Sequence, residues 1–190
     1  MSKPASLRHY RFTVRDYFRM GEVRILDEDD RVELLEGEIV ETSPIGNVHA
    51  AVVSRLTALF VPAATERAVV RVQDPAILND FSAPQPDIAV VAYRADFYVG
   101  AHPRPGDVLL IVEVADGSIR TDLGLKARLY ASAGVAEYWV VDLARRRIVV
   151  HAQPEGDRYA SVQRFTGTDT VATAAFPGEH WAVDEILVRS

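Results

Sequence analysis

Residues 107–142 read DVLLIVEVADGSIRTDLGLKARLYASAGVAEYWVVD, and this stretch decides the fold. It opens with an apolar run over residues 108–112, which has the composition of a buried β-strand. A helical segment follows from about residue 121 to residue 133 and ends at Gly134, where the left-handed backbone of a helix end favours glycine. A second apolar run, residues 138–141, predicts another strand. The stretch therefore predicts a strand, a helix and a strand in succession.

The rest of the chain predicts further strands and helices around this unit. Thr13 is a candidate N-cap for a helix over about residues 14–26, and apolar residues recur at helical spacing from about 49 to 64. Two short strands are expected to meet at Glu36-Gly37, and more strands precede and follow the stretch quoted above. The expected fold is α/β (mixed α+β), a single domain over residues 1–190 with a mixed central sheet flanked by helices.

The composition is that of a soluble globular protein, with 48% hydrophobic and 25% charged residues. No apolar run approaches the roughly 18 residues of a membrane helix, and the N-terminal residues lack the apolar region of a secretory signal. The chain has no cysteine, which excludes disulfides and thiolate metal sites and favours the cytoplasm. We therefore expect a cytoplasmic protein with no membrane segment.

The formal net charge is −6, which argues against a protein that coats nucleic acid through its own basic surface. It does not argue against a metal-dependent nuclease. Such an enzyme gathers carboxylates at its site, and the bound cation reverses the local sign of the charge.

Glu113 stands inside an apolar strand segment, between Val112 and Val114. Burial there disfavours the charged form unless a cation or several donors compensate it. On a strand, Glu113 shares a face with Leu109 and Ile111, which directs its carboxylate inward or to the lip of a cleft. The alternative is that the strand reaches the surface and Glu113 meets solvent or an arginine.

Asp87 precedes a second apolar strand segment, residues 88–91. Pro86-Asp87 alone is an ordinary turn pair. Together, Asp87 and Glu113 match the one or two carboxylates that Mg²⁺ takes beside water and phosphate oxygens. The two acids therefore indicate a divalent-metal site for phosphoryl chemistry.

Lys126 lies on the helix that follows Glu113, one turn after Asp122. A solvent-exposed Asp122–Lys126 pair is the simpler interpretation. If the helix packs over the strand that carries Glu113, however, the ammonium points to the same cleft. It can then orient a water or stabilise charge on the transferring phosphoryl group.

Glu36 and His49 are two further candidates, each with a plainer alternative. Glu36 occupies the hairpin joint, where it is either an exposed turn carboxylate or a third acid near the metal. His49 opens a helix, whose positive dipole end can meet a phosphate, although a histidine there is more often only a boundary residue.

Several segments together form a specific pattern. They are residues 33–40 (ELLEGEIV), 86–91 (PDIAVV), 112–114 (VEV), Asp122 with Lys126, and 130–142 (YASAGVAEYWVVD). The pattern resembles the putative restriction endonuclease family of the PD-(D/E)XK nuclease superfamily, formerly a domain of unknown function. The resemblance runs over nearly the whole chain, from about residue 13 to about residue 187.

The resemblance implies a restriction-endonuclease-like fold and assigns roles to the candidates. Asp87 and Glu113 would be the metal-binding acids, and Glu36 would be the acid from the early hairpin. The usual lysine stands two residues after the second acid, where this chain has Ala115. The family moves that lysine to the following helix, where Lys126 matches.

The expected activity is that of a Mg²⁺- or Mn²⁺-dependent endonuclease, a hydrolase of DNA phosphodiester bonds that acts through Asp87, Glu113, Lys126 and Glu36. The resemblance also makes a homodimer plausible, since cutting both strands of a duplex favours a two-fold assembly. Two alternatives stay open. One is an inactive nuclease-fold module that binds nucleic acid or protein, which the net charge and Ala115 favour. The other is a small-molecule phosphohydrolase, because no residue in the sequence identifies a base-reading element.

Overall fold

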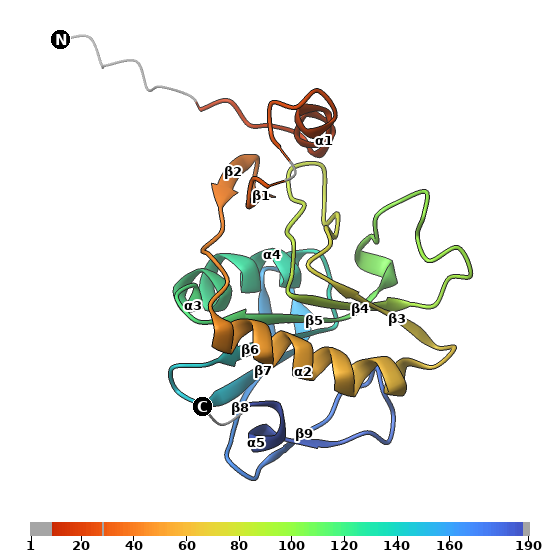
Figure 1. Ribbon diagram of the computed structural model, residues 1–190, viewed down its shortest axis with the longest axis vertical. Helices are drawn as coiled ribbons and strands as arrows, with labels where there is room; N and C mark the ends of the chain where they lie inside the picture. Colours follow the sequence, from red (N-terminus) through yellow and green to blue (C-terminus); the bar gives the residue numbers. More distant parts are fainter. Residues whose placement is uncertain (1–8, 28, 188–190) are drawn as a thin grey trace, which may run out of the picture.

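A six-stranded β-sheet forms the centre of the structure, a computed structural model that describes residues 9–27 and 29–187. The strands lie side by side in the order β3-β4-β5-β6-β7-β8 (Figure 1). β5 and β6 run parallel, whereas the other neighbouring strands of this sheet pair antiparallel. The bounds are β3 (Ala68–Val72), β4 (Ile88–Ala92), β5 (Val108–Ala115), β6 (Glu137–Asp142), β7 (Arg147–Glu155) and β8 (Arg158–Thr166). The mixed sheet confirms the predicted fold class.

Helices cover both faces of this sheet (Figure 1). On one face lie α2 (Asn47–Ala64) and the short α5 (Val183–Ile186). On the other face lies one continuous helical segment, made of α3 (Ile119–Thr121), the π-helical turn η2 (Asp122–Lys126) and α4 (Ala127–Ser132). The sequence predicted this segment to within two residues at its start, but it gave no sign of the π-helical turn.

Smaller elements complete the chain. α1 (Val14–Glu22) begins after Thr13, the predicted N-cap, which forms a capping box with Asp16, and the helix ends before residue 26. β1 (Val32–Leu35) and β2 (Glu38–Glu41) form the predicted hairpin. The remaining elements are the 3₁₀ turn η1 (Pro105–Asp107) and the paired short strands β9 (Thr170–Val171) and β10 (Trp181–Ala182).

Strand β5 separates two hydrophobic clusters, one on each face of the sheet. Val112 packs toward α2, whereas Ile111 packs toward α4. A β-bulge interrupts this alternation, because Val108 pairs with Val91 while Leu110 already pairs with Val90. The extra residue, Leu109, consequently packs with the α2 cluster. The expectation that Leu109 shares the face of Ile111 is therefore wrong, since a bulge breaks the period of two.

Helix α2 is 18 residues long with a mean hydropathy of 1.2, so by length and composition alone it is apolar enough to cross a membrane. This corrects the expectation that no segment approaches that length. In the structure, Val52, Leu56 and Phe60 of α2 are buried against the sheet. A helix that buries one face in a core often has this composition, and α2 serves as a core helix of the fold.

The turn of the β1–β2 hairpin depends on a glycine. Glu36 and Gly37 both have positive φ, 52° and 84°. The Gly37 amide donates to the carbonyl of Phe81, and its carbonyl accepts from Phe12. A Cβ on Gly37 would lie 2.7 Å from the Cβ of Arg11. The hairpin therefore rests on the N-terminal segment so closely that only glycine fits at this position.

We predict that Gly37→Ala destabilises the protein more than Gly156→Ala, a matched change at another left-handed position. Gly156 has φ of 63°, and a Cβ there meets nothing within 4 Å. Both variants adopt an unfavourable φ at a cost of about 1–2 kcal/mol, while Gly37→Ala adds a steric cost of about 1–3 kcal/mol. Urea unfolding of both variants measures the difference, and equal midpoints would contradict the packing described here.

Candidate active site

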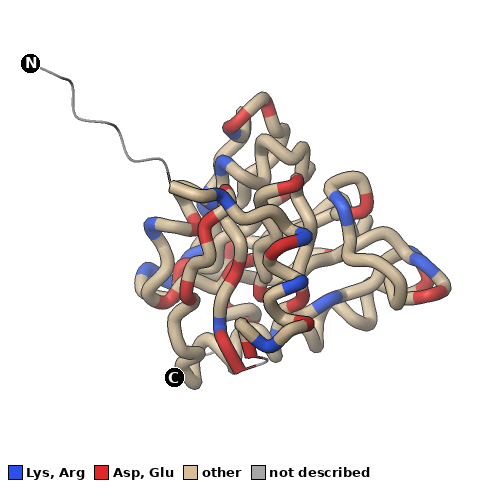
Figure 2. The backbone as a smooth tube through the Cα atoms, turned by 90° about the horizontal axis from the view of Figure 1, so that it is seen from above, with Lys and Arg blue, Asp and Glu red and all other residues tan. Residues whose placement is uncertain are grey.

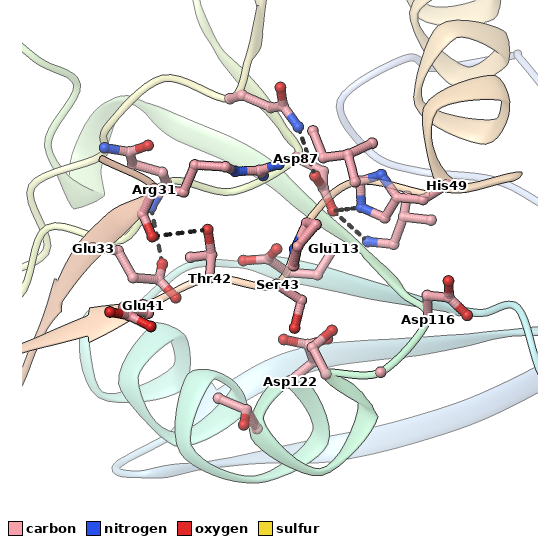
Figure 3. Close-up of a pocket in the computed structure, with 18 of the residues that line it drawn as sticks. Arg31, Glu33, Glu41, Thr42, Ser43, His49, Asp87, Glu113, Asp116 and Asp122 are labelled. Atoms are coloured by element: carbon pink, nitrogen blue, oxygen red, sulfur yellow. Dashed lines mark hydrogen bonds and ion pairs between the residues drawn. The ribbon is translucent and has the colours of Figure 1, made fainter. Parts of the chain in front are cut away.

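A pocket of about 430 Å³ opens where strands β4 and β5 meet the β1–β2 hairpin and the start of α2 (Figure 3). The first residue before β4 and the last residues of β5 lie at the same end of the sheet, because the two strands are antiparallel. The segment from Asp116 to Lys126 closes another side of the pocket. The pocket therefore draws its walls from five separate parts of the chain.

Asp87 points into this pocket from the start of β4 (Figure 3). By alternation along the strand, its side chain lies on the face of Ala89, which belongs to the α4 cluster. Its Oδ2 accepts hydrogen bonds from the amide of Val114 at 2.8 Å and from Nε2 of His49 at 3.0 Å. The amide group of Gln73 donates to Oδ1 at 3.3 Å. The chain thus holds Asp87 beside β5.

Glu113 enters the pocket from β5, on the same face of the sheet as Asp87 (Figure 3). Its side chain is 6% exposed. Oε1 accepts hydrogen bonds from Nζ of Lys126 at 2.9 Å and from the hydroxyl of Tyr130 at 2.8 Å. Burial raises the pKa of Glu113 to about 8, an effect that the Lys126 ammonium reduces and the neighbouring Asp122 carboxyl increases.

Lys126 lies in the π-helical turn η2, and its side chain is only 7% exposed. Its Nζ forms ion pairs with Glu113 at 2.9 Å and with Oε1 of Glu33 at 3.1 Å. Burial alone would lower the pKa of Lys126, but the carboxylates of Glu113 and Glu33 outweigh it and raise the pKa above its usual value. The structure therefore places Lys126 in the pocket with Asp87 and Glu113, and not in an exposed pair with Asp122.

Glu36 does not reach the pocket. It occupies the hairpin turn with its side chain exposed, while its backbone amide donates to Ser82 and its carbonyl accepts from Arg11. This corrects the prediction that Glu36 is the hairpin acid near the metal. The acid that lies there is Glu33, which is buried in β1 and lines the pocket.

A signal for Glu33 exists in the sequence. It stands inside the apolar run of β1, next to Val32 and Leu34, as Glu113 stands inside β5. Glu36 instead precedes a glycine at a turn, where polar residues are common and solvent is near. Oε2 of Glu33 also accepts from the amide of Gln85 at 3.2 Å, so the acid joins β1 to the loop that leads to Asp87.

His49 lies in the first turn of α2 and points toward Asp87 (Figure 3). Its Nε2 is 3.0 Å from Asp87 Oδ2, and its Nδ1 is buried with no hydrogen-bond partner among the described residues. The predicted contact of His49 with phosphate stays a prediction. What the structure shows is a direct contact with one of the two acids.

Asp122 is a buried acid of this pocket to which the sequence assigned only a surface role. The hydroxyl of Ser118 donates to its Oδ2. Burial raises the pKa of Asp122, while the Lys126 ammonium and the Ser118 hydrogen bond oppose that rise. The acid therefore adds to the negative character of the wall formed by residues 116–126.

The pocket is more acidic than the chain as a whole. Acidic and basic residues are interspersed along the backbone (Figure 2), but seven carboxyl groups line the pocket against two basic side chains, Arg31 and Lys126. The acids are Asp30, Glu33, Glu41, Asp87, Glu113, Asp116 and Asp122. Such an excess of carboxyl groups favours a bound cation.

The acids of the pocket suit an open metal site and not one that encloses the ion with protein ligands. Among residues 9–27 and 29–187, no group of three or more His, Asp or Glu side chains is arranged to enclose a metal ion. Asp87 and Glu113 form an open pair instead. Mg²⁺ commonly binds through one or two carboxylates and completes its coordination with water and phosphate oxygens, so an open pair of this kind suits it.

The fold is similar to a solved structure described as a putative nuclease belonging to DUF820 from Anabaena variabilis ATCC 29413. The superposition has a TM-score of 0.71, covers 93% of this chain and 97% of the other, and aligns residues that are 14% identical. At that identity the likeness shows the fold alone. No curated protein matches the chain.

A family model agrees with this likeness. The model of the Uma2 family, described as putative restriction endonuclease, matches residues 14–184. The match includes Glu33, Asp87, Glu113 and Lys126 and supports a nuclease-like function, the hydrolysis of nucleic acid. Because it spans most of the 190 residues, the protein belongs to the Uma2 family of putative restriction endonucleases.

Proposed function

We propose that the protein is a Mg²⁺- or Mn²⁺-dependent endonuclease that hydrolyses DNA phosphodiester bonds. The observation that carries the proposal is the meeting of Asp87 and Glu113 in one pocket, with the Lys126 ammonium 2.9 Å from the second acid. Family membership supports it, because nucleases with the restriction-endonuclease-like fold generally use divalent metals. DNA is the substrate that the family description favours.

In this proposal Asp87 and Glu113 hold the cation. When bound, a divalent cation polarises a phosphodiester and lowers the pKa of an attacking water. The hydrogen bonds from Val114 and Tyr130 fix the two carboxylates before a substrate arrives. Fixed carboxylates need little reorganisation, which is the physical basis of preorganised catalysis.

Lys126 supplies the positive charge that lies next to the reacting phosphate. Its ammonium orients a water or stabilises negative charge that develops on the phosphate oxygens. Glu33 gives Lys126 a second anionic partner at 3.1 Å. When Glu113 shares its charge with a cation, Glu33 therefore still holds the ammonium in the pocket.

Three further parts of the proposal rest on the sequence and the family. His49 contacts a phosphate oxygen of the substrate through its backbone amide in the first turn of α2, while its imidazole stays on Asp87. The enzyme acts in the cytoplasm, as a chain without cysteine is suited to do. It acts as a homodimer, since two related sites can cut both strands of a duplex.

We predict that Asp87→Asn lowers the rate of plasmid cleavage with Mn²⁺ by about 100-fold or more, because the variant loses a charged metal ligand and metal activation is worth several kcal/mol. Asp157→Asn is the matched control, since Asp157 is exposed at the β7–β8 turn. Cleavage of supercoiled, linear and single-stranded DNA with each metal is the measurement. Undiminished cleavage by Asp87→Asn would identify the activity as a contaminant.

We predict that Lys126→Met abolishes cleavage and also destabilises the fold. The change removes the only cation that is ion-paired to both Glu113 and Glu33 within the described part of the chain, at a cost of about 3–5 kcal/mol for a broken buried pair. The double variant Lys126→Met/Glu113→Gln removes one of the stranded acids. It should regain part of the stability without regaining cleavage, which separates the two roles in thermal unfolding and cleavage assays.

We predict that Glu33→Gln impairs cleavage at least about 10-fold, as loss of a supporting partner commonly does, whereas the same change at Glu36 leaves cleavage as in the wild type. Both residues come from one hairpin, but only Glu33 contacts Lys126. The measurement compares the cleavage rates of the purified variants at equal concentrations of folded protein. A defect in Glu36→Gln with normal cleavage by Glu33→Gln would restore Glu36 as the hairpin acid.

A further inference from the structure

The two acids of the pocket share one arrangement, in which fixed donors saturate a single oxygen of each carboxylate. Oε1 of Glu113 receives both the Lys126 ammonium and the Tyr130 hydroxyl, at 2.9 and 2.8 Å. No donor among the described residues hydrogen-bonds to its Oε2. Tyr130 lies on α4 and is fully buried, and burial raises the pKa of its hydroxyl well above the usual value. The hydroxyl is therefore a hydrogen-bond donor to Oε1 of Glu113.

Asp87 repeats this arrangement with different partners. Its Oδ2 receives the amide of Val114 and Nε2 of His49, at 2.8 and 3.0 Å. Its Oδ1 receives only the side-chain amide of Gln73, at a longer 3.3 Å. Because Gln73 is exposed, its amide can turn away when a ligand approaches Oδ1.

His49 keeps its hydrogen bond to Asp87 although its other ring nitrogen has no partner among the described residues. Since Oδ2 is a carboxylate acceptor, Nε2 carries the hydrogen of this contact, and Nδ1 is a buried nitrogen with no partner within residues 9–27 and 29–187. Unpaired buried polar atoms are rare in proteins and are unfavourable. The fold retains the imidazole here in spite of that cost.

We propose that Tyr130 and His49 are positioning residues that occupy one oxygen of Glu113 and one oxygen of Asp87, and thereby make the pocket select small octahedral cations over Ca²⁺. The inference rests on the proposed function, because it assumes that the two acids bind the metal. It goes further by naming the residues that set the metal preference.

The physical reason lies in how the two kinds of cation use carboxylates. Ca²⁺ takes six to eight oxygen ligands at longer distances and often binds both oxygens of one carboxylate, whereas Mg²⁺ demands near-octahedral geometry at short distance and keeps several waters. A carboxylate with one oxygen already saturated by two donors offers only the other. Loss of the Tyr130 or His49 donor leaves the second oxygen with one donor instead of two. That oxygen can then turn more readily to a cation, which improves the site for Ca²⁺ relative to Mn²⁺.

The test is calorimetric titration of Mn²⁺ and of Ca²⁺ into the full-length wild type, Tyr130→Phe and His49→Phe, without substrate. The wild type should prefer Mn²⁺, and each variant should narrow the ratio of Mn²⁺ to Ca²⁺ affinity by about 10-fold, the scale of other changes to groups that hold metal ligands. His49→Gln, whose amide can donate to Asp87, should return the ratio toward the wild-type value.

Tyr159→Phe is the matched control, since its buried hydroxyl donates at 2.9 Å to the carbonyl of Val135 and contacts neither acid. It should keep the wild-type ratio. If Tyr130→Phe and His49→Phe weaken both metals equally, the two residues have only a structural role and this inference is overturned while the metal site stands. If the folded wild type binds neither metal, the proposed function and the inference both fail.

Discussion

The ion pairs of one buried ammonium hold the pocket together. Lys126 comes from a π-helical turn, Glu113 from the central strand β5, and Glu33 from a hairpin far earlier in the chain. Nζ of Lys126 lies 2.9 Å from Oε1 of Glu113 and 3.1 Å from Oε1 of Glu33. Taking these charges out of water is costly, and it is tolerated only where the partners are close and well placed. This contact ties the hairpin to the central sheet at the pocket.

Much of this fold could be predicted from the sequence, because local rules govern its elements. The apolar runs predicted β4, β5 and β6, and the period of two along a strand put Glu113 on the face of Ile111, the face that packs against α4 in the structure. The same rule failed at Leu109, since a bulge depends on the partner strand. Glu33 and Glu36 show the same limit. Long-range packing decides which of the two hairpin acids meets Lys126, and spacing along the chain does not reveal that packing.

The presence of a lysine at position 126, in place of an arginine, is itself informative. The chain contains two lysines, Lys3 and Lys126, against nineteen arginines. A chain that uses arginine for nearly every other cation, yet keeps a lysine here, needs the properties of that side chain. An ammonium is a compact point charge with three donors, whereas a guanidinium is a wide planar fork. A compact group suits a position between two buried carboxylates, one of which also accepts from a tyrosine.

The buried acids of the pocket lower the stability of the fold but suit a site that binds a cation. Burial raises the pKa of Glu113 and of Asp122 above their usual values, so the fold holds both carboxyl groups where their charged forms are disfavoured. The ammonium of Lys126 and the guanidinium of Arg31 cannot neutralise seven carboxyl groups. Acids with such perturbed pKa values are common at functional sites, where a ligand can compensate their charge. A divalent cation is a ligand of the right sign and size for an open pair of carboxylates, and it would also lend the site its affinity for a phosphate. An excess of acid that by itself repels the phosphates of a nucleic acid would, under the proposed function, become the means of binding them through the metal.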